Sequence, residues 1–154
     1  MIISGGPEMT ICSLRDSVDG LKALAHPVRL RILALLRGGE LCVCQITAIL
    51  GLAPSTISEH LSLLRRTGVL VERREGKWVF YALAEASVWG PLCEALWPLV
   101  EGDGALQADA RQGAKVRQAP LPVLCKGSLT FQGPSPEPRF PLTDTSLQLH
   151  GEPR

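Results

Sequence analysis

Cys42 and Cys44, separated by a single valine, are the residues of this sequence whose type and spacing point most directly to chemistry. Thiolates are soft ligands, and soft ligands favour thiophilic and borderline metal ions over hard ones. The pair stands at the start of a predicted helix, on which residues two apart point about 200° away from each other. We therefore expect that binding both thiols to one ion unwinds or deforms the first helical turn, so that the pair would act as a switch.

The remaining cysteines and the histidines are spread along the chain, at Cys12, Cys93, Cys125, His26, His60 and His150. An odd total of five cysteines favours metal ligands, thiols or redox groups over a disulfide framework. Cys93 lies on a predicted helix, where burial as a small apolar residue is favoured over ligation. His26 lies at a predicted helix junction, where a capping or structural role is favoured over ligation.

The elements that must position these residues are mostly helical, because apolar residues recur at three- and four-residue spacing from Leu21 to Leu36 and again further along. One helix is expected to end near His26, and Pro27 opens the next, since the first helical turn tolerates its missing N–H. β-Prone residues joined by a charged turn containing Gly76 predict a hairpin. The elements expected after the first helix are helices at 27–37, 44–50, 54–67 and within 86–102, and strands at 69–73 and 78–83.

Two short helices joined by a tight Gly-bearing turn and followed by a hairpin predict a winged helix-turn-helix, mainly α with a small β-hairpin. In this arrangement the second helix lies in the major groove of DNA, and the hairpin tip touches phosphates or the minor groove. A merely polar helix surface is the alternative, and the charge of residues 12–82, with ten Lys/Arg against six Asp/Glu, does not by itself decide against it. The helix, the turn and the basic hairpin tip together favour DNA as the partner. The candidate DNA-binding residues are Ser55, Thr56, Ser58, His60 and Arg65 on the helix, and Arg73, Arg74 and Lys77 on the hairpin.

Three stretches, LKALAHPVRLRILALL, ELCVCQI and STISEHLSLLRRTGVLVERREGKWVFYAL, together resemble the ArsR/SmtB family of bacterial metal-sensing repressors, particularly its arsenic-responsive branch. The resemblance covers about residues 21–83. It implies a homodimer that sits on double-stranded operator DNA and leaves it when metal binds, with the first and last helices forming the dimer interface. It also implies that Cys42 and Cys44 are metal ligands and that helix 54–67 reads the DNA.

The sequence departs from the arsenic-responsive pattern at Thr47, which stands where that pattern has a third cysteine. A hydroxyl is a poor ligand for a soft ion, so a third ligand is expected elsewhere. Cys12 is preferred, because in the related cadmium/lead-sensing branch N-terminal cysteines of one subunit join the pair of the other; Cys93 and Cys125 are the alternatives. The predicted inducer is arsenite or antimonite, As(III) or Sb(III), with Cd(II) or Pb(II) as the alternative and no organic cofactor. Zinc is not expected, since 86–102 contains no histidine.

The predicted organisation is a winged-helix DNA-binding and dimerisation domain at 1–101 and a mostly disordered tail at 102–154, where prolines are concentrated. No apolar run approaches the roughly 18 residues of a membrane span, so we expect no membrane partner and a cytoplasmic location. An enzyme is not expected, because the sequence has no phosphate-binding Gly-rich loop and no C-x-x-C motif. A thiol-based redox sensor on the same DNA-binding fold remains the rival interpretation.

Overall fold

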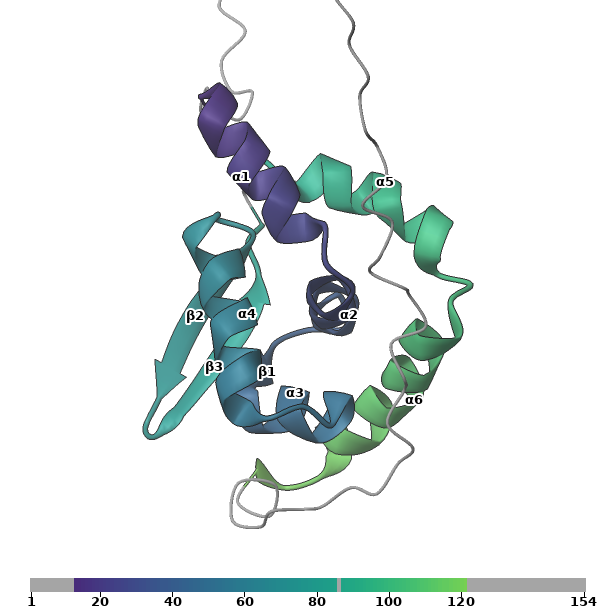
Figure 1. The fold of residues 1–154 in the computed structure, drawn as a ribbon. Coiled ribbons are helices and arrows are strands. Elements are labelled where there is room, and N and C mark those ends of the chain that lie inside the picture. Colours follow the sequence, from purple (N-terminus) through teal and green to yellow (C-terminus); the bar gives the residue numbers. More distant parts are fainter. Residues whose placement is uncertain (1–12, 86, 122–154) are drawn as a thin grey trace, which may run out of the picture.

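The computed structural model describes residues 13–85 and 87–121 as a mainly helical fold with a small antiparallel sheet, a winged helix-turn-helix (Figure 1). Helix α2 runs through the middle of the molecule, and the other elements surround it. The elements are α1 (Leu14–Leu24), α2 (Pro27–Leu36), β1 (Leu41–Cys42), α3 (Val43–Leu50), α4 (Pro54–Arg66), β2 (Leu70–Glu75), β3 (Trp78–Leu83), α5 (Gly90–Val100) and α6 (Gly104–Gln118).

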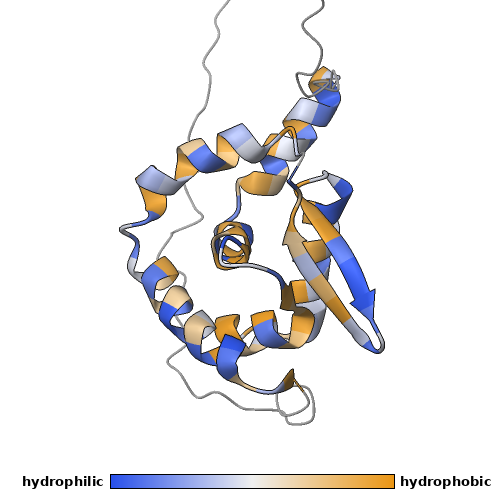
Figure 2. Cartoon of the chain, turned by 180° about the vertical axis from the view of Figure 1, so that it is seen from behind, coloured by the Kyte–Doolittle hydropathy of each residue, from blue (hydrophilic) through white to orange (hydrophobic). Residues whose placement is uncertain are grey.

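The hydrophobic core forms between α2 and the helices around it. Ile32 and Leu33 of α2 are fully buried, and the inward face of α4 contributes a narrow apolar stripe of Ile57, Leu61 and Leu64. Burial of such side chains stabilises the fold by roughly 1.5–3 kcal/mol each. Figure 2 colours the chain by hydropathy and shows a largely hydrophilic β2 beside a more hydrophobic β3.

The helices predicted at 27–37, 44–50 and 54–67 are confirmed within one residue at each end, and the helix predicted within 86–102 is α5. Pro27, Pro54 and Pro91 each stand in the first turn of a helix. The turn between α3 and α4 begins at Gly51, whose φ of 66° is a left-handed conformation that glycine adopts without strain. These two helices with their tight turn confirm the predicted helix-turn-helix.

The predicted hairpin of β2 and β3 is confirmed, but the sheet has a third strand that was not predicted. Strand order is β1-β3-β2, and β1 pairs with β3 so that Leu41 lies opposite Tyr81 and Cys42 opposite Phe80. Two residues are too few to show an alternating pattern in sequence, so β1 left no signal. As a result the cysteine region is joined by backbone hydrogen bonds to the wing.

The expectation that the chain is mostly disordered from Gly102 onward is wrong for residues 104–118, which form α6. Asp103 caps this helix by accepting hydrogen bonds from the N–H groups of Ala105 and Leu106. The buried face of α6 is Asp109, Gly113 and Val116, and such small and polar residues give no apolar period. Residues 122–154 of the predicted tail lie outside the described residues, and no described helix is long and apolar enough to cross a membrane.

Candidate metal centre and nucleic-acid interface

Cys42 and Cys44 lie at the junction between the sheet and α3. Cys42 ends β1 and is the N-cap residue of α3, with an extended backbone (φ −84°, ψ 163°), whereas Cys44 lies in the first helical turn. The expectation that helical periodicity holds the two thiols on different faces is therefore wrong, because Cys42 is outside the helix. Cys42 is 1% exposed and Cys44 is half-buried. The Cys42 N–H donates to Oε1 of Gln45 at 2.9 Å, which fixes the start of the helix.

The pair supplies two soft sulfur donors, which fits a thiophilic ion better than a hard one. Among residues 13–85 and 87–121, no group of three Cys, His, Asp or Glu side chains is arranged to hold a metal ion. Cys93, one of the alternative third ligands, lies instead in the core, where burial and then the charge of Glu94 raise the pKa of its thiol. The other two candidates, Cys12 and Cys125, lie outside the described residues, so any third donor from this chain is a prediction about those segments or about a second copy.

Thr47 lies one helical turn beyond Cys44, at the position of the missing third thiol. Its Oγ1 is buried, and within the described part of the chain it has no hydrogen-bond partner. A buried hydroxyl without a partner costs free energy, on the order of 1–3 kcal/mol. The site therefore has a desolvated polar atom where the arsenic-responsive pattern places sulfur.

The turn that leads into the thiol pair is held by two arginines from distant elements. Arg73 of β2 donates to both carboxylate oxygens of Glu40, with Nη2 at 2.5 Å and Nε at 3.2 Å, and these bonds lower the pKa of the Glu40 carboxyl. Arg117 of α6 donates to the carbonyls of Leu35 (2.9 Å), Glu40 (3.0 Å) and Gly39 (3.1 Å). Sequence reasoning missed Glu40 and Arg117, because a single charged residue carries no signal of a distant partner.

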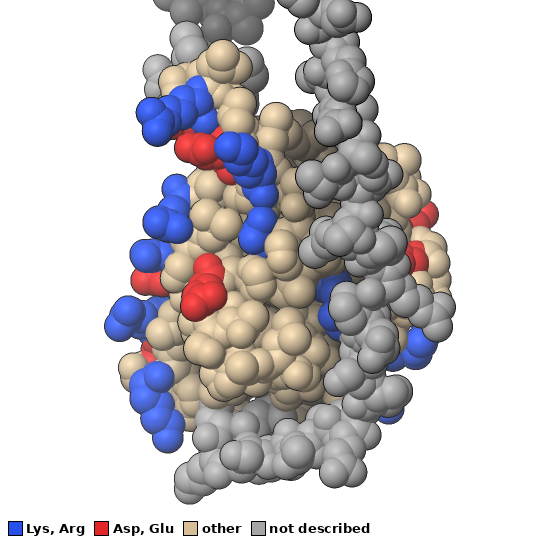
Figure 3. Space-filling view, viewed as in Figure 1, with Lys and Arg blue, Asp and Glu red and all other residues tan. Residues whose placement is uncertain are grey.

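The outer face of α4 presents the polar side chains predicted to contact DNA. Ser55, Ser58 and Arg65 are exposed, Thr56 is half-buried, and Arg65 lies 3.6 Å from Glu72 of β2. A shallow groove on this face is lined by Ser58, Glu59, Ser62, Arg65 and Arg66. Figure 3 shows Lys and Arg side chains along the edge of the molecule formed by α1, α4 and the hairpin. That distribution suits a phosphate backbone, where basic side chains supply affinity.

His60 differs from the other candidates on α4 because it lies against α2. Its ring centroid is 4.7 Å from that of His26, and its Nδ1 is 3.5 Å from Nη1 of Arg29. Burial, followed by the charge of Arg29, lowers the pKa of both histidines. His26 also caps α2, since its Nδ1 accepts from the Val28 N–H at 3.1 Å, which agrees with the capping role favoured from the sequence.

The three basic residues predicted on the wing differ in their surroundings. Arg73 is held by Glu40 and by Glu75, whose Oε2 lies 2.5 Å from its Nη1, and its guanidinium stacks 4.7 Å from the Phe80 ring centroid. Lys77 lies 5.3 Å from the ring centroid of Trp78, and Arg74 is exposed. Arg74 and Lys77 are therefore better placed than Arg73 to reach phosphates.

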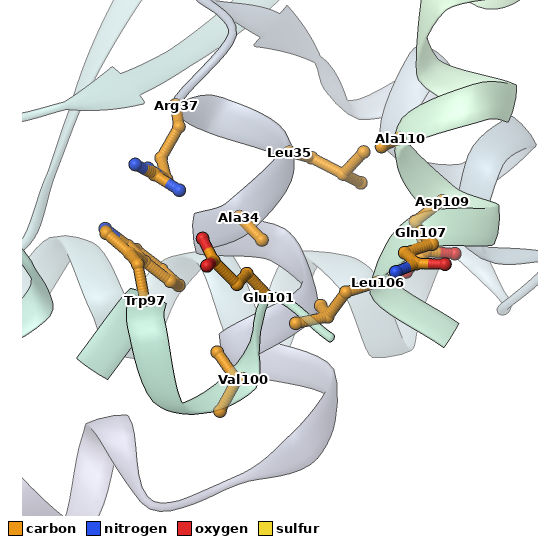
Figure 4. Close-up of a pocket in the computed structure, with 10 residues that line it drawn as sticks. All are labelled: Ala34, Leu35, Arg37, Trp97, Val100, Glu101, Leu106, Gln107, Asp109 and Ala110. Carbon is orange, nitrogen blue, oxygen red and sulfur yellow. The ribbon is translucent and has the colours of Figure 1, made fainter. Parts of the chain in front are cut away.

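A separate cavity of about 180 Å³ lies between α2, α5 and α6. Figure 4 shows its lining, with Arg37 and Trp97 at one end and Leu106 and Gln107 at the other. The guanidinium of Arg37 lies 4.9 Å from the Trp97 ring centroid. The lining contains none of the predicted metal or DNA-binding residues, so this cavity is distinct from both candidate sites.

A family model described as the bacterial regulatory protein, arsR family, matches residues 26–71, a range that contains Cys42, Cys44 and the whole of α4. The arsenic resistance transcriptional regulator ArsR1 of Pseudomonas putida is 49% identical over 63 residues, which are 40% of this chain and 49% of that protein. The chain thus spans about half the length of that relative.

Two further similarities cover more of the other protein. The HTH-type transcriptional regulator CmtR of Mycobacterium tuberculosis is 41% identical over 103 residues, which are 66% of this chain and 84% of that protein. The solved structure of HlyU from Vibrio cholerae has a TM-score of 0.51 and 37% sequence identity, covering 56% of this chain and 92% of that one. The similarity to CmtR is one of sequence, and the similarity to HlyU holds in both sequence and fold.

Proposed function

The chain belongs to the arsR family of bacterial regulatory proteins, and from this premise we propose that it is a metalloid-responsive transcriptional repressor rather than an enzyme. In this proposal a homodimer binds operator DNA and leaves it when arsenite or antimonite binds Cys42 and Cys44. The observation that carries the proposal is the place of the thiol pair, between a strand of the wing sheet and the helix that precedes α4.

The DNA-binding part of the proposal rests on α4 and the hairpin. Ser55 and Ser58 face outward on α4, where a recognition helix would meet base edges, and Arg65 lies further along the same helix. Arg74 and Lys77 stand on the hairpin, where they would neutralise phosphates and position the protein. Binding is then expected to weaken steeply with salt, because phosphate contacts release counterions.

The homodimer part rests on apolar side chains that α1 and α5 leave exposed. Leu14 (82% exposed), Leu21 (50%) and Val18 (39%) lie on α1, and Leu99 (79%) lies on α5. Exposed apolar residues on two helices suit an interaction surface if they are covered together by one partner. A second copy of the chain would cover them, and a dimer would present two recognition helices to the two halves of an inverted repeat.

In the proposed mechanism the ligand shifts a pre-existing equilibrium between conformations that bind DNA well and poorly. Cys42 and Cys44 would hold the trivalent ion through their sulfur atoms, and a third thiolate would come from Cys12. Drawing the N-cap residue and the first turn of α3 together would strain both β1 and α3. Since α3 packs against α4, and β1 pairs with β3, the strain would displace both α4 and the hairpin, the two elements proposed to contact DNA.

The decisive experiment is a titration of the full-length protein with arsenite, without oxygen and with a monothiol or phosphine reductant. Fluorescence anisotropy would follow binding to a duplex that the wild-type protein selects from a randomised pool. The wild type should lose affinity by about 5- to 150-fold, the usual range of allosteric coupling. Cys42→Ser and Cys44→Ser should bind the duplex as the wild type does and keep that affinity in arsenite.

The matched control for these variants is Cys93→Ala, which removes a thiol in the core and should leave the response intact. A double variant of Cys42 and Cys44 that still responds normally would sink the site assignment. A Cys12→Ser variant tests the third ligand. Cd(II) and Pb(II) titrations decide between the inducer classes, and a response to peroxide but not to arsenite would favour the redox sensor.

The DNA contacts are tested in the same assay at rising salt. Arg74→Ala should weaken binding to every duplex and reduce the slope of log K against log salt by about 0.9 for each phosphate that is no longer neutralised. Lys115→Ala, an equal loss of charge at an exposed position of α6, is the control. Equal slopes for the two variants would exclude Arg74 as a phosphate contact.

A further inference from the structure

We propose that Glu40 is a positioning residue that couples the thiol pair to the wing, with Arg73 serving as the anchor of the wing rather than as a phosphate contact. This inference rests on the proposed function, since it concerns how the thiol site would regulate DNA binding. It adds a residue and a route: from Cys42 through Glu40 to Arg73.

Glu40 joins three elements at one point of the chain. Its side chain accepts from Nε and Nη2 of Arg73 on β2, its backbone carbonyl accepts from Arg117 on α6, and two residues later the chain reaches Cys42. A bidentate carboxylate–guanidinium pair fixes direction as well as distance. Any shift of the backbone at the thiol pair is therefore transmitted to the wing, and α6 holds the other side of the turn.

The Arg117 clamp limits how the turn before the pair can move. One guanidinium donates to the carbonyls of Leu35, Gly39 and Glu40, so the end of α2 and the start of β1 are tied to the same side chain. Two carbonyls of the turn, those of Gly39 and Glu40, are held by Arg117 of α6, which limits how far the turn can flex when Cys42 is displaced. The displacement is passed instead to the wing through the Glu40–Arg73 ion pair, which lies at the surface.

The sheet register gives a second contact along the same route. Phe80 of β3 lies opposite Cys42 of β1 on one side and opposite Arg73 of β2 on the other. Residues directly opposite each other across antiparallel strands share a face of the sheet. The Arg73 guanidinium lies 4.7 Å from the centroid of the Phe80 ring. Phe80 therefore lies between Cys42 and Arg73 across the three strands of the sheet.

Two carboxylates already neutralise Arg73, which argues against a main role in binding phosphate. Glu40 and Glu75 both lie within 2.5 Å of its terminal nitrogens. A DNA phosphate would have to displace one of them. The neighbouring Arg74 is exposed, so phosphate contacts are available to the wing without Arg73.

The chain offers a matched pair of variants for the test. Glu40→Gln and Glu75→Gln each remove one carboxylate from Arg73 and change the charge of the wing equally, but only Glu40 is connected to the thiol pair. The full-length protein would be titrated with sodium arsenite while anisotropy reports binding to the selected duplex. Ultraviolet absorbance of the thiolate–arsenic bond would report ligand binding separately, and thermal melting would confirm that each variant is folded.

We expect arsenite to lower the DNA affinity of the wild type by about 5- to 150-fold, the usual range of allosteric coupling. The loss for Glu75→Gln should agree with that of the wild type within about twofold. Glu40→Gln should bind arsenite with the same absorbance change as the wild type. Its DNA affinity should then fall by less than about threefold, which is below the usual range of allosteric coupling. Glu40→Asp, which keeps the charge but shortens the reach to Arg73, should also lose coupling.

The outcomes separate this inference from the proposed function. If arsenite leaves the DNA affinity of the wild type unchanged, the proposed function is wrong and the inference is overturned with it. If the wild type responds and Glu40→Gln responds equally, only the inference is overturned. An equal loss of coupling in Glu40→Gln and Glu75→Gln would also overturn it, because the cause would then be wing charge rather than the link to Cys42.

Discussion

The surface of α4 and the thiol pair carry the two halves of the proposed function, and they are built in different ways. The α4 surface comes from one continuous helix, whose inward stripe of Ile57, Leu61 and Leu64 is fully buried and whose outward residues face solvent. The thiol pair occupies a short junction that is held by β3, by Arg73 of the wing and by Arg117 of α6.

The difference has a physical consequence. A helix anchored by its own apolar stripe keeps its outer face in place when a distant interaction breaks, because local packing fixes it. A junction held from outside changes position when its supports change, and that sensitivity is what a switch needs. In this molecule the surface of α4 that we propose to contact DNA is the stable half, and the thiol pair is the adjustable half.

The largest expected effect comes from loosening α6, the helix that carries Arg117 and so supports the thiol pair from a distance. Asp109 of α6 forms a bidentate ion pair with Arg31 of α2 at 2.6 and 2.7 Å, and only 6% of its side chain is exposed. Asp109→Ala leaves a largely buried guanidinium without its partner, so the free energy of unfolding should fall by about 3 kcal/mol. Urea unfolding measures this loss, and limited proteolysis should show earlier cleavage in α6.

The control for this variant is Glu72→Gln, which removes the partner of Arg65 in a longer and more exposed ion pair of 3.6 Å. Its cost should stay below about 1 kcal/mol, as for surface salt bridges generally. Equal costs for the two variants would mean that α6 is not fixed by its buried ion pair. The comparison between an internally anchored helix and an externally held junction would then fail.

Adding a third thiol to the site within α3 should have a smaller effect, which is a gain in arsenite affinity. Thr47→Cys replaces a buried hydroxyl that has no hydrogen-bond partner among the described residues with a similar-sized thiol. The site would then have three sulfur donors in one segment, and arsenite affinity should rise by roughly tenfold, or about 1.4 kcal/mol. Competition with a dithiol chelator measures this affinity.

Thr47→Val is the matched control, because it also removes the hydroxyl but supplies no sulfur. If valine and cysteine change the affinity alike, the gain comes from packing rather than ligation. If neither changes it, the missing third position of the motif is not part of the site. The wild-type dependence on Cys12 should disappear in Thr47→Cys, since the junction would no longer need an outside donor.

The same contrast explains which features could be predicted from the sequence. Pro54, the apolar stripe of α4 and Gly51 are local signals, so α4 and the turn before it were predicted closely. The supports of the thiol pair are not local: Arg117 lies 82 positions from Leu35, and Arg73 lies 33 positions from Glu40. Helix α6 was missed because its buried face depends on Gly113 and on the charged Asp109 rather than on large apolar residues.

The chemical role of the cysteine pair stays a prediction, whereas the geometry expected for the pair was wrong. The sequence suggested two thiols on one helix, whereas Cys42 belongs to β1 because its backbone pairs with Phe80, 38 positions further on. Pairing with a distant strand overrides local helical preference, and a two-residue strand shows no pattern of its own. The misplacement matters, since it hid the connection between the thiol pair and the wing.

The smallest expected effect is a pH dependence of the contact that fixes α4 to α2. The pKa values of His26 and His60 are lowered from 6.5 by burial and then by Arg29, so the native state favours the neutral rings. The unfolded chain therefore binds more protons below pH 6.5, and stability that is complete above this value is lost as the pH falls through the lowered native values. Thermal melts at pH 7.5 and 5 should show a smaller drop in Tm for His60→Gln than for the wild type. Equal drops in Tm would mean that carboxylates elsewhere, and not this histidine pair, set the sensitivity of the fold to acid.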